Sequence, residues 1–173
     1  AISSPGGATA LIADGTSSLS LRVTATGGSE RAPVPGLTIR LTAGDRFDDR
    51  NGDGVYGSGD ALIATGDSNG NGVWDALGSV PSTVVTDASG AADFVLHGSL
   101  TVGTAWVRAT SMGRSTDLAV QFHPTALMVV VQQPAARELL SDGISSTQIV
   151  AGVSDYVGNP ISGVIVRFTA GEP

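Results

Sequence analysis

The stretch Pro33-Val34-Pro35-Gly36-Leu37-Thr38-Ile39-Arg40-Leu41-Thr42-Ala43-Gly44 decides the fold of this chain of 173 residues. Its Pro and Gly residues favour a turn. After the turn, apolar Leu37, Ile39 and Leu41 alternate with polar or charged side chains. Alternation with a period of two is the pattern of a β-strand that has one buried face. The stretch therefore predicts a turn followed by a half-buried strand.

The same alternation occurs in four other segments, separated by turns rich in Gly, Pro and Asp, and no long amphipathic helical pattern accompanies them. Short alternating strands with such turns are typical of all-β proteins, and two antiparallel sheets packed face to face bury one face of each strand. We therefore expect an all-β sandwich. The four further segments are residues 19–24, 92–97, 104–109 and 118–123.

The chain also repeats itself. Asp14-Gly15-Thr16-Ser17-Ser18 returns as Asp142-Gly143-Ile144-Ser145-Ser146, and residues 33–44 return as the similar stretch 160–171. The copies are separated by 128 and 127 positions. Self-similarity at a nearly fixed period is typical of tandem repeat proteins. The sequence thus predicts one module followed by the front part of a second.

Composition narrows the function classes. The net charge of −7 argues against nucleic acid or an anionic membrane as a partner, and no apolar run is long enough to span a bilayer. Without Cys or Lys there can be no disulfide, thioester or Lys–Asn isopeptide cross-link. Of the common ways to stabilise a secreted β-protein, bound calcium remains. Because the first residue is Ala1 rather than Met, we expect a processed or excised piece.

A polar motif occurs twice between residues 49 and 78. Asp49-Arg50-Asn51-Gly52-Asp53-Gly54-Val55-Tyr56 is followed eighteen positions later by Asp67-Ser68-Asn69-Gly70-Asn71-Gly72-Val73-Trp74. Ca²⁺ binds six to eight oxygens, and a loop with Asp or Asn at positions 1, 3 and 5, Gly at 6 and a carbonyl at 7 supplies them. We name these segments the first loop (49–60) and the second loop (67–78).

The first loop reads D-x-N-x-D-G-x5-D, which is close to the EF-hand pattern and resembles the calcium loop of dockerins. The second loop has Gly78 at position 12 and a late carboxylate, Asp75, at position 9. This shorter form resembles the D-x-N-G-N-G-V-W-D loops of many secreted bacterial repeat proteins. We therefore expect Ca²⁺ as the cofactor. The expected ligands are Asp49, Asn51, Asp53, the Val55 carbonyl and Asp60 in the first loop, and Asp67, Asn69, Asn71, the Val73 carbonyl and Asp75 in the second.

Two readings of these loops stay open. Seven of the sixteen acidic residues lie between Asp45 and Asp75, and their mutual repulsion would be relieved by a divalent cation. The alternative is an Asx- and Gly-rich surface turn without an ion, because Asx and Gly dominate turns for their own reasons.

Four motifs in order carry a family resemblance: A-D-G-x-S-S at 13–18, V-P-G-x-x-I-R-L-T at 34–42, T-D-x-x-G-x-A at 86–92, and residues 103–109. This order resembles the bacterial immunoglobulin-like repeats of invasin- and intimin-type surface proteins. The resemblance implies a seven-strand immunoglobulin-like β-sandwich that acts as a stalk or spacer. It covers roughly residues 8–123 as one complete module; the stretch from Asp45 to about Pro81 departs from it.

The resulting domain prediction is an immunoglobulin-like module at 1–123 with a calcium-loop insert at 45–80, and the first strands of a second module at 124–173. The expected function is that of a non-enzymatic, calcium-stabilised stalk module of an extracellular bacterial or archaeal cell-surface protein or fibre, related to adhesion. The alternative is a carbohydrate- or receptor-binding adhesin domain.

The sequence evidence for other candidate sites is weaker than that for the calcium loops. His97 and His123 are lone histidines on strands, and no G-x-S-x-G elbow exposes a nucleophilic Ser. Paired Asp residues in the insert could serve a glycosidase, but their spacing fits ion coordination better. Trp74 and Trp106 could form a sugar platform; we favour packing roles, with Trp74 seating its loop on the sandwich and Trp106 covering a sheet face.

The second repeat should leave an apolar face bare. Either a longer parent chain supplies the missing strands, or strands of another copy complete the sandwich by β-strand addition, which would propagate head-to-tail into a fibre. Expected partners are thus other copies or neighbouring repeats, with pairing along Val164–Thr169. The residues of the bare face are Ile149, Ala151, Val153, Val164, Val166 and Phe168.

Overall fold

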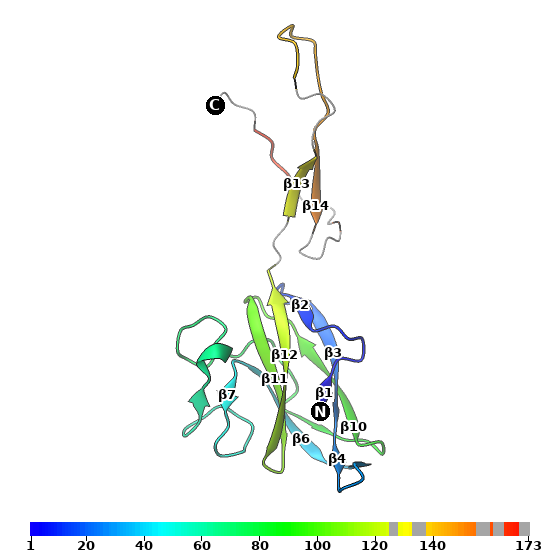
Figure 1. Ribbon diagram of the computed structural model, residues 1–173, viewed down its shortest axis with the longest axis vertical. Coiled ribbons are helices and arrows are strands. Elements are labelled where there is room, and N and C mark those ends of the chain that lie inside the picture. The colour runs from blue at the N-terminus through cyan, green and yellow to red at the C-terminus, as the bar shows by residue number, and fades with distance from the viewer. Residues whose placement is uncertain (125–127, 133–137, 155–159, 161–164, 170–173) are drawn as a thin grey trace. The chain divides into compact units, whose positions relative to one another are not determined.

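The computed structural model (Figure 1) describes residues 1–124, 128–132, 138–154, 160 and 165–169. The chain divides into two compact units, residues 1–124 and 125–173, and each is described by itself. Val164, which we expected to pair with a neighbour, lies outside the described residues, as do most of residues 155–164.

The first unit is built from two β-sheets (Figure 1). The alternating segments predicted from the sequence all form strands of these sheets. In spatial order, the first sheet consists of β1 (Ile2–Ser3), β3 (Ser18–Thr24) and β10 (Ala91–His97). The second consists of β2 (Ala10–Ile12), β12 (Arg114–His123), β11 (Gly103–Ser111), β6 (Thr38–Gly44) and β9 (Thr83–Val85).

This strand order is that of an immunoglobulin-like β-sandwich, in which the chain crosses repeatedly between the two sheets. The predicted fold class is therefore confirmed. One pairing differs from the expected antiparallel sheets, because β2 runs parallel to β12, with Leu11 opposite Phe122. The N-terminal segment causes this difference: it pairs with β3 as β1 and then crosses to the other sheet as β2.

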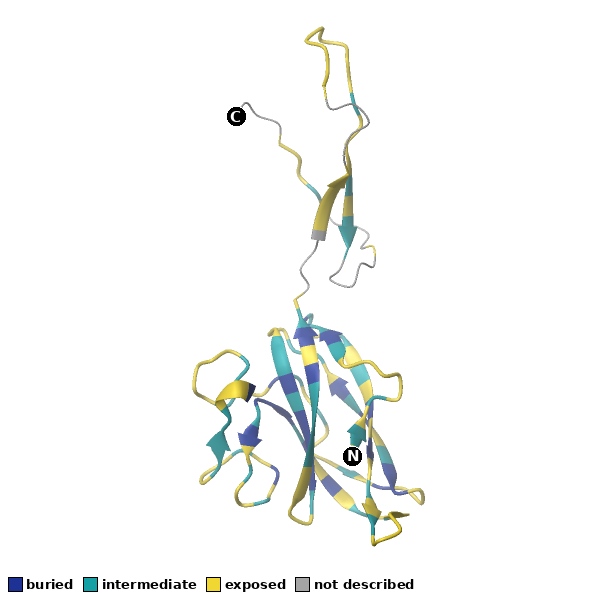
Figure 2. Ribbon diagram, in the orientation of Figure 1, coloured by how far each residue is buried: buried dark blue, intermediate teal, exposed yellow. Residues whose placement is uncertain are grey.

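The core lies between the two sheets, and Figure 2 shows buried residues on strands of both of them. Leu21 and Leu96 from the first sheet and Val107 and Val120 from the second have no exposed surface. Burying such a side chain contributes about 1.5–3 kcal/mol to the free energy of unfolding. The period-two pattern therefore both selects the strands and provides the packing that holds the sheets together.

Small hairpins and one short helical turn complete the first unit. None of them adds a strand to the main sheets. They are β4 (Thr26–Gly27) paired with β5 (Ala32–Pro33), β7 (Phe47–Asp48) paired with β8 (Ala61–Leu62), and the 3₁₀ turn η1 (Ala64–Gly66).

In the described part of the second unit, β13 (Met128–Gln132) pairs with β14 (Val150–Ser154) in an antiparallel ribbon. Residues 165–169, which the repeat predicted to be a strand like β6, have no strand assignment, and Ile165 is 95% exposed. In the first unit β6 is held between β9 and β11. No counterpart of those partners occurs among the described residues of the second unit.

The repeated Asp-Gly motif forms the same turn in both units. The Asp14 carboxylate accepts hydrogen bonds from the N–H groups of Thr16 and Ser17 at 2.8 and 2.7 Å, and from the Ser17 hydroxyl at 2.8 Å. Asp142 accepts the equivalent bonds from Ile144 and Ser145. These bonds favour the charged carboxylate and lower the pKa of each Asp to about 2.

We predict that both turn carboxylates titrate well below an ordinary Asp. Because the pKa is lower in the folded protein, the stabilisation is complete above the unfolded pKa of about 3.9 and is lost as the pH falls toward the folded pKa. Carboxyl-carbon NMR titration should give values of about 2 for Asp14 and Asp142.

The matched variant is Asp14→Asn, which should lose less stability than the wild-type protein when the pH is lowered from 5 to 2. Identical slopes for the two proteins in that pH range, or an Asp14 pKa near the ordinary value of 3.8, would contradict the prediction.

Candidate calcium-binding site

The insert (residues 45–80) leaves the second sheet at the end of β6 and returns before β9, forming a lobe at one side of the sandwich (Figure 1). Phe47 and Leu77 are each 2% exposed and anchor its two ends. Gly44 at the end of β6 forms an isolated β-bridge with Ala76. The insert is therefore packed onto the sandwich and is not a free loop.

The first loop is organised by its own side-chain oxygens. The Asp49 carboxylate accepts hydrogen bonds from the N–H groups of Asp53 at 3.1 Å and Gly54 at 2.9 Å. Gly52 and Gly54 have φ angles of 72° and 78°, a left-handed conformation that favours Gly. A Cβ at Gly54 would also lie 2.7 Å from the Cβ of Thr110, so this loop is seated directly on β11.

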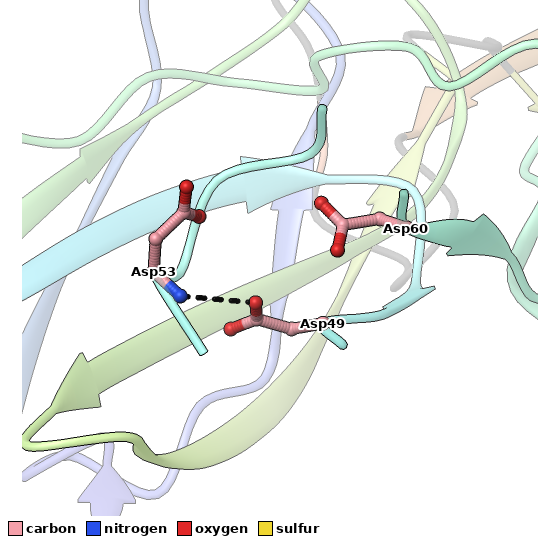
Figure 3. A group of neighbouring side chains, drawn as sticks. All are labelled: Asp49, Asp53 and Asp60. Carbon is pink, nitrogen blue, oxygen red and sulfur yellow. Dashed lines mark hydrogen bonds between the residues drawn. The ribbon is translucent and has the colours of Figure 1, made fainter. Parts of the chain in front are cut away.

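Three carboxylates of the first loop converge on one space, as Figure 3 shows for Asp49, Asp53 and Asp60. Each offers an oxygen, and these oxygens all lie within 4.8 Å of one another. Asp60 is oriented by the N–H groups of Arg50 at 3.0 Å and Gly57 at 2.9 Å. Since a Ca–O distance is 2.3–2.6 Å, two ligands of one Ca²⁺ lie at most about 5 Å apart. The spacing of these carboxylates fits a single Ca²⁺.

The second loop repeats the main-chain pattern of the first. In each loop, the side chains at positions 1, 3 and 5 accept hydrogen bonds from the N–H groups at positions 6, 5 and 7. The sequence repeat is thus also a structural repeat. The matched acceptors, with distances in the first and second loops, are Asp49 and Asp67 (2.9 and 2.8 Å), Asn51 and Asn69 (2.9 and 3.0 Å), and Asp53 and Asn71 (2.8 and 2.7 Å).

The second loop differs in its charge. It has two carboxylates, and both amide groups, of Asn69 and Asn71, donate to Asp75 Oδ2 at 2.8 Å. Hydrogen bonds from the N–H groups of Gly72 and Gly70, the first being the larger cause, lower the pKa of Asp67. Gly78 has no side-chain oxygen with which to close the loop, and a Cβ at this position would lie 2.7 Å from the His97 carbonyl oxygen.

The structure assigns Asp45 a role that the sequence pattern did not reveal. We counted it among the clustered acids, but it is 2% exposed, and its carboxylate accepts hydrogen bonds from the N–H groups of Ser68 at 2.8 Å and Asp75 at 2.9 Å. Its main chain also bonds Asp75 and the Trp74 indole. Asp45 therefore joins the second loop to the end of β6. The sequence feature that could have indicated this role is the position of Asp45 directly after a predicted strand.

Arg108 also differs from expectation. The alternation of β11 placed it on the wetter face, yet it is 7% exposed because the insert covers it. Its guanidinium forms a two-bond ion pair with Asp117 at 2.8 and 3.1 Å and donates to the Phe47 carbonyl at 2.8 Å. It also stacks over the Phe47 ring at 4.2 Å. This buried Arg fixes the entry of the insert onto the sheet.

Both Trp residues make packing contacts within the first unit. Trp74 stacks on Tyr56 with ring centroids 5.7 Å apart, and its indole N–H donates to the Asp45 carbonyl at 2.7 Å. Trp106 on β11 lies beneath the guanidinium of Arg46, 4.5 Å from the ring centroid. His97 is exposed on β10, and its main chain forms a bridge with Ser79.

Among known proteins, the chain is similar to several solved structures. No family model and no curated protein matches the chain. Similar structures include invasin, described as a bacterial integrin-binding protein (18% identity, TM-score 0.45, 94% of this chain and 27% of that chain), and the D0-D1 domains of intimin (14%, 0.46, 90% and 64%). A third is the adhesin InvE of Yersinia pseudotuberculosis (16%, 0.44, 91% and 41%).

The chain thus spans less than two thirds of the length of each of these three proteins. Among the residues that the structure describes, no helix has the length and apolar character needed to cross a membrane.

We predict that Gly44→Ala destabilises the first unit by about 1–3 kcal/mol, the usual cost of overpacking. A Cβ at this position would lie 2.5 Å from the Asp75 carbonyl oxygen and 2.6 Å from Trp74 Cζ2, so the second loop would be displaced from β6. Urea unfolding followed by circular dichroism measures the change.

Gly57→Ala is the matched control within the insert, since no atom lies within 4 Å of its added Cβ. Equal unfolding free energies for the Gly44 and Gly57 variants would show that the second loop does not rest on the end of β6.

Proposed function

We propose that the first unit is a calcium-stabilised structural module of an extracellular bacterial surface protein. The observation that carries the proposal is the convergence of Asp49, Asp53 and Asp60 on one space in a loop whose main chain is already turned around it. Hard oxygen ligands at this spacing suit Ca²⁺.

The first ion would be held by the side-chain oxygens of Asp49, Asn51, Asp53 and Asp60 with the Val55 carbonyl. The second would be held by Asp67, Asn69, Asn71 and Asp75 with the Val73 carbonyl. The second site has fewer charges and no closing carboxylate, so we assign it the weaker affinity.

Electrostatics supports an ion in the first loop. Neighbouring carboxylates repel one another by about 1 kcal/mol per close pair in a water-like dielectric. Arg50 in the same loop pairs with Asp48 at 3.1 Å, outside the three converging carboxylates. A divalent cation would convert the repulsion into coordination and would tie Asp60, at the far end of the loop, to Asp49 at its start.

The proposed location on a cell surface is supported by the chain's own sequence motifs. The order of its A-D-G-x-S-S, V-P-G and T-D-x-x-G-x-A segments resembles the repeats of invasin- and intimin-type surface proteins, which act as stalks in adhesins. Asp87 in the last motif caps its turn by accepting the N–H groups of Ser89 at 2.8 Å and Ala91 at 3.0 Å. The proposed role is therefore mechanical spacing on an extracellular surface, without catalysis.

A carbohydrate- or receptor-binding role is the alternative. A hollow of about 460 Å³ lies beside Trp106. Several of the groups that line it are engaged internally: Arg108 pairs with Asp117, and Arg46 lies over the Trp106 ring, although Arg108 Nη1 and Arg46 Nε have no hydrogen-bond partner. The structural role is better supported, because the aromatic and charged groups that would contact a sugar already contact one another.

We further propose that the second unit is completed by strands of another module, either another copy or a neighbouring repeat. Its Asp142 turn matches the Asp14 turn of the first unit, and β13 pairs with β14 as β1 pairs with β3. Leu21 of the first unit is fully buried, but the matching Ile149 is 51% exposed. Val129, Val130 and Val131 of β13 are also 50–55% exposed, and an apolar sheet face requires a second sheet to cover it.

Calcium removal provides the first test. Binding to the folded state alone stabilises by about 2.7 kcal/mol at a free-calcium concentration of about 100 times Kd. We expect excess EGTA to lower the melting temperature and to make the insert sensitive to protease. An unchanged melting curve in calcium and in EGTA would refute the calcium proposal.

Two variants rank the sites within the same experiment. In saturating calcium, Asp53→Ala should lower the melting temperature more than Asn71→Ala, since it removes a charged ligand at the equivalent position 5. In EGTA the two variants should differ much less. The reverse order in calcium would show that the ligands are wrongly assigned.

Sedimentation velocity tests the second-unit proposal. The chain should self-associate as its concentration rises, and Ile149→Asp should abolish association by charging the exposed face. The control is Val85→Asp, which charges a 60% exposed apolar residue of the first unit. A protein that stays monomeric at every concentration would contradict completion by another copy and leave the neighbouring repeat as the source.

A further inference from the structure

The two loops are joined by aromatic side chains at equivalent positions. Tyr56 occupies position 8 of the first loop and Trp74 occupies position 8 of the second. Their rings are stacked, with centroids 5.7 Å apart and planes inclined by 13°. Residues eighteen positions apart in the sequence are therefore in direct contact, and each directly follows the Val whose carbonyl is a proposed ligand.

A third ring supports this pair from the sandwich side. Phe47, at 2% exposure, meets Tyr56 edge-on at 5.6 Å and Trp74 edge-on at 6.3 Å. Trp74 is fixed further by its hydrogen bond to the Asp45 carbonyl and by its contact with Gly44. The stack is thus a packed part of the insert, and displacement of one ring would disturb the other.

Ion binding at either loop would act on this stack. A calcium ligand at the Val55 carbonyl restrains the peptide that joins Val55 to Tyr56, and the same holds for Val73 and Trp74. Once one ring is held, the second loop loses less conformational freedom when its own ion binds. A smaller entropy cost for the second ligand is positive cooperativity without any large structural change.

We propose that the two loops bind calcium cooperatively and that Tyr56 and Trp74 are the positioning residues that couple them. The inference rests on the proposed calcium function and deepens it, because it makes the insert one two-ion unit rather than two separate sites. By linkage, each ion must raise the affinity for the other by the same factor.

Calorimetric calcium titration of single-loop variants tests the coupling. Asp53→Ala disables the first loop, and Asp67→Ala disables the second. The Kd of the second loop should rise by about fivefold or more when the first loop is disabled, and the reciprocal change should be equal. In a Tyr56→Ala background the factor should fall to about one, whereas Tyr56→Phe, which keeps the ring, should retain it.

Fluorescence gives a readout that simple destabilisation would not produce. The chain has two Trp residues, so Trp106→Phe leaves Trp74 as the only reporter. With the second loop disabled by Asp67→Ala, calcium bound to the first loop should still change the emission of Trp74. The change should disappear when Tyr56→Ala is added, while circular dichroism confirms that each variant is folded.

The outcomes separate the two proposals. If the wild-type protein takes up no calcium, the calcium function itself fails. If it binds calcium but the affinity of each loop is independent of the other, the calcium function stands and the coupling is overturned. Coupling that persists undiminished in the folded Tyr56→Ala variant also overturns the inference, since the stack would then not transmit it.

Discussion

The contact between the end of β6 and the second loop is the constraint on which the insert depends. Gly44 leaves room for Trp74 and the Asp75 main chain, and the next residue, Asp45, holds the loop through both its carboxylate and its main chain. A buried carboxylate that accepts two main-chain hydrogen bonds is satisfied without a cation. The acidic stretch therefore contains two kinds of Asp: Asp45 supports the structure, whereas Asp49, Asp53 and Asp60 present oxygens to a common space.

The sandwich and the insert stabilise each other through residues that make contacts in both. Arg108 is part of β11, yet it pairs with Asp117 and binds the Phe47 carbonyl of the insert. Phe47 in turn contacts Tyr56 and Trp74. An ion held in either loop would thus be connected to the sheet by a short chain of packed groups.

In the second unit, the turn and the two-stranded ribbon are formed, but residues 165–169 are not part of a sheet. The Asp142 turn and the β13–β14 ribbon form from hydrogen bonds among nearby residues, and they match the first unit. Residues 165–169 do not form a strand, whereas the matching residues of the first unit form β6 between β9 and β11. Val129, Val130 and Val131 of β13 are 50–55% exposed, and Ile149, directly before β14, is 51% exposed.

The sequence by itself determined the five long strands of the first unit, the two Asp-Gly turns and the repeat of the loops, since each depends on local periodicity or on side chains that bond their own main chain. Period-two alternation predicted β3, β6, β10, β11 and β12, and the Asx and Gly spacing predicted the course of both loops. Only the tertiary structure decided which groups the insert covers. Burial of Arg108, the supporting role of Asp45, the parallel pairing of β2 with β12 and the Tyr56–Trp74 stack all join residues distant in the chain or in different loops. Their physical cause is packing between elements, which no local pattern encodes.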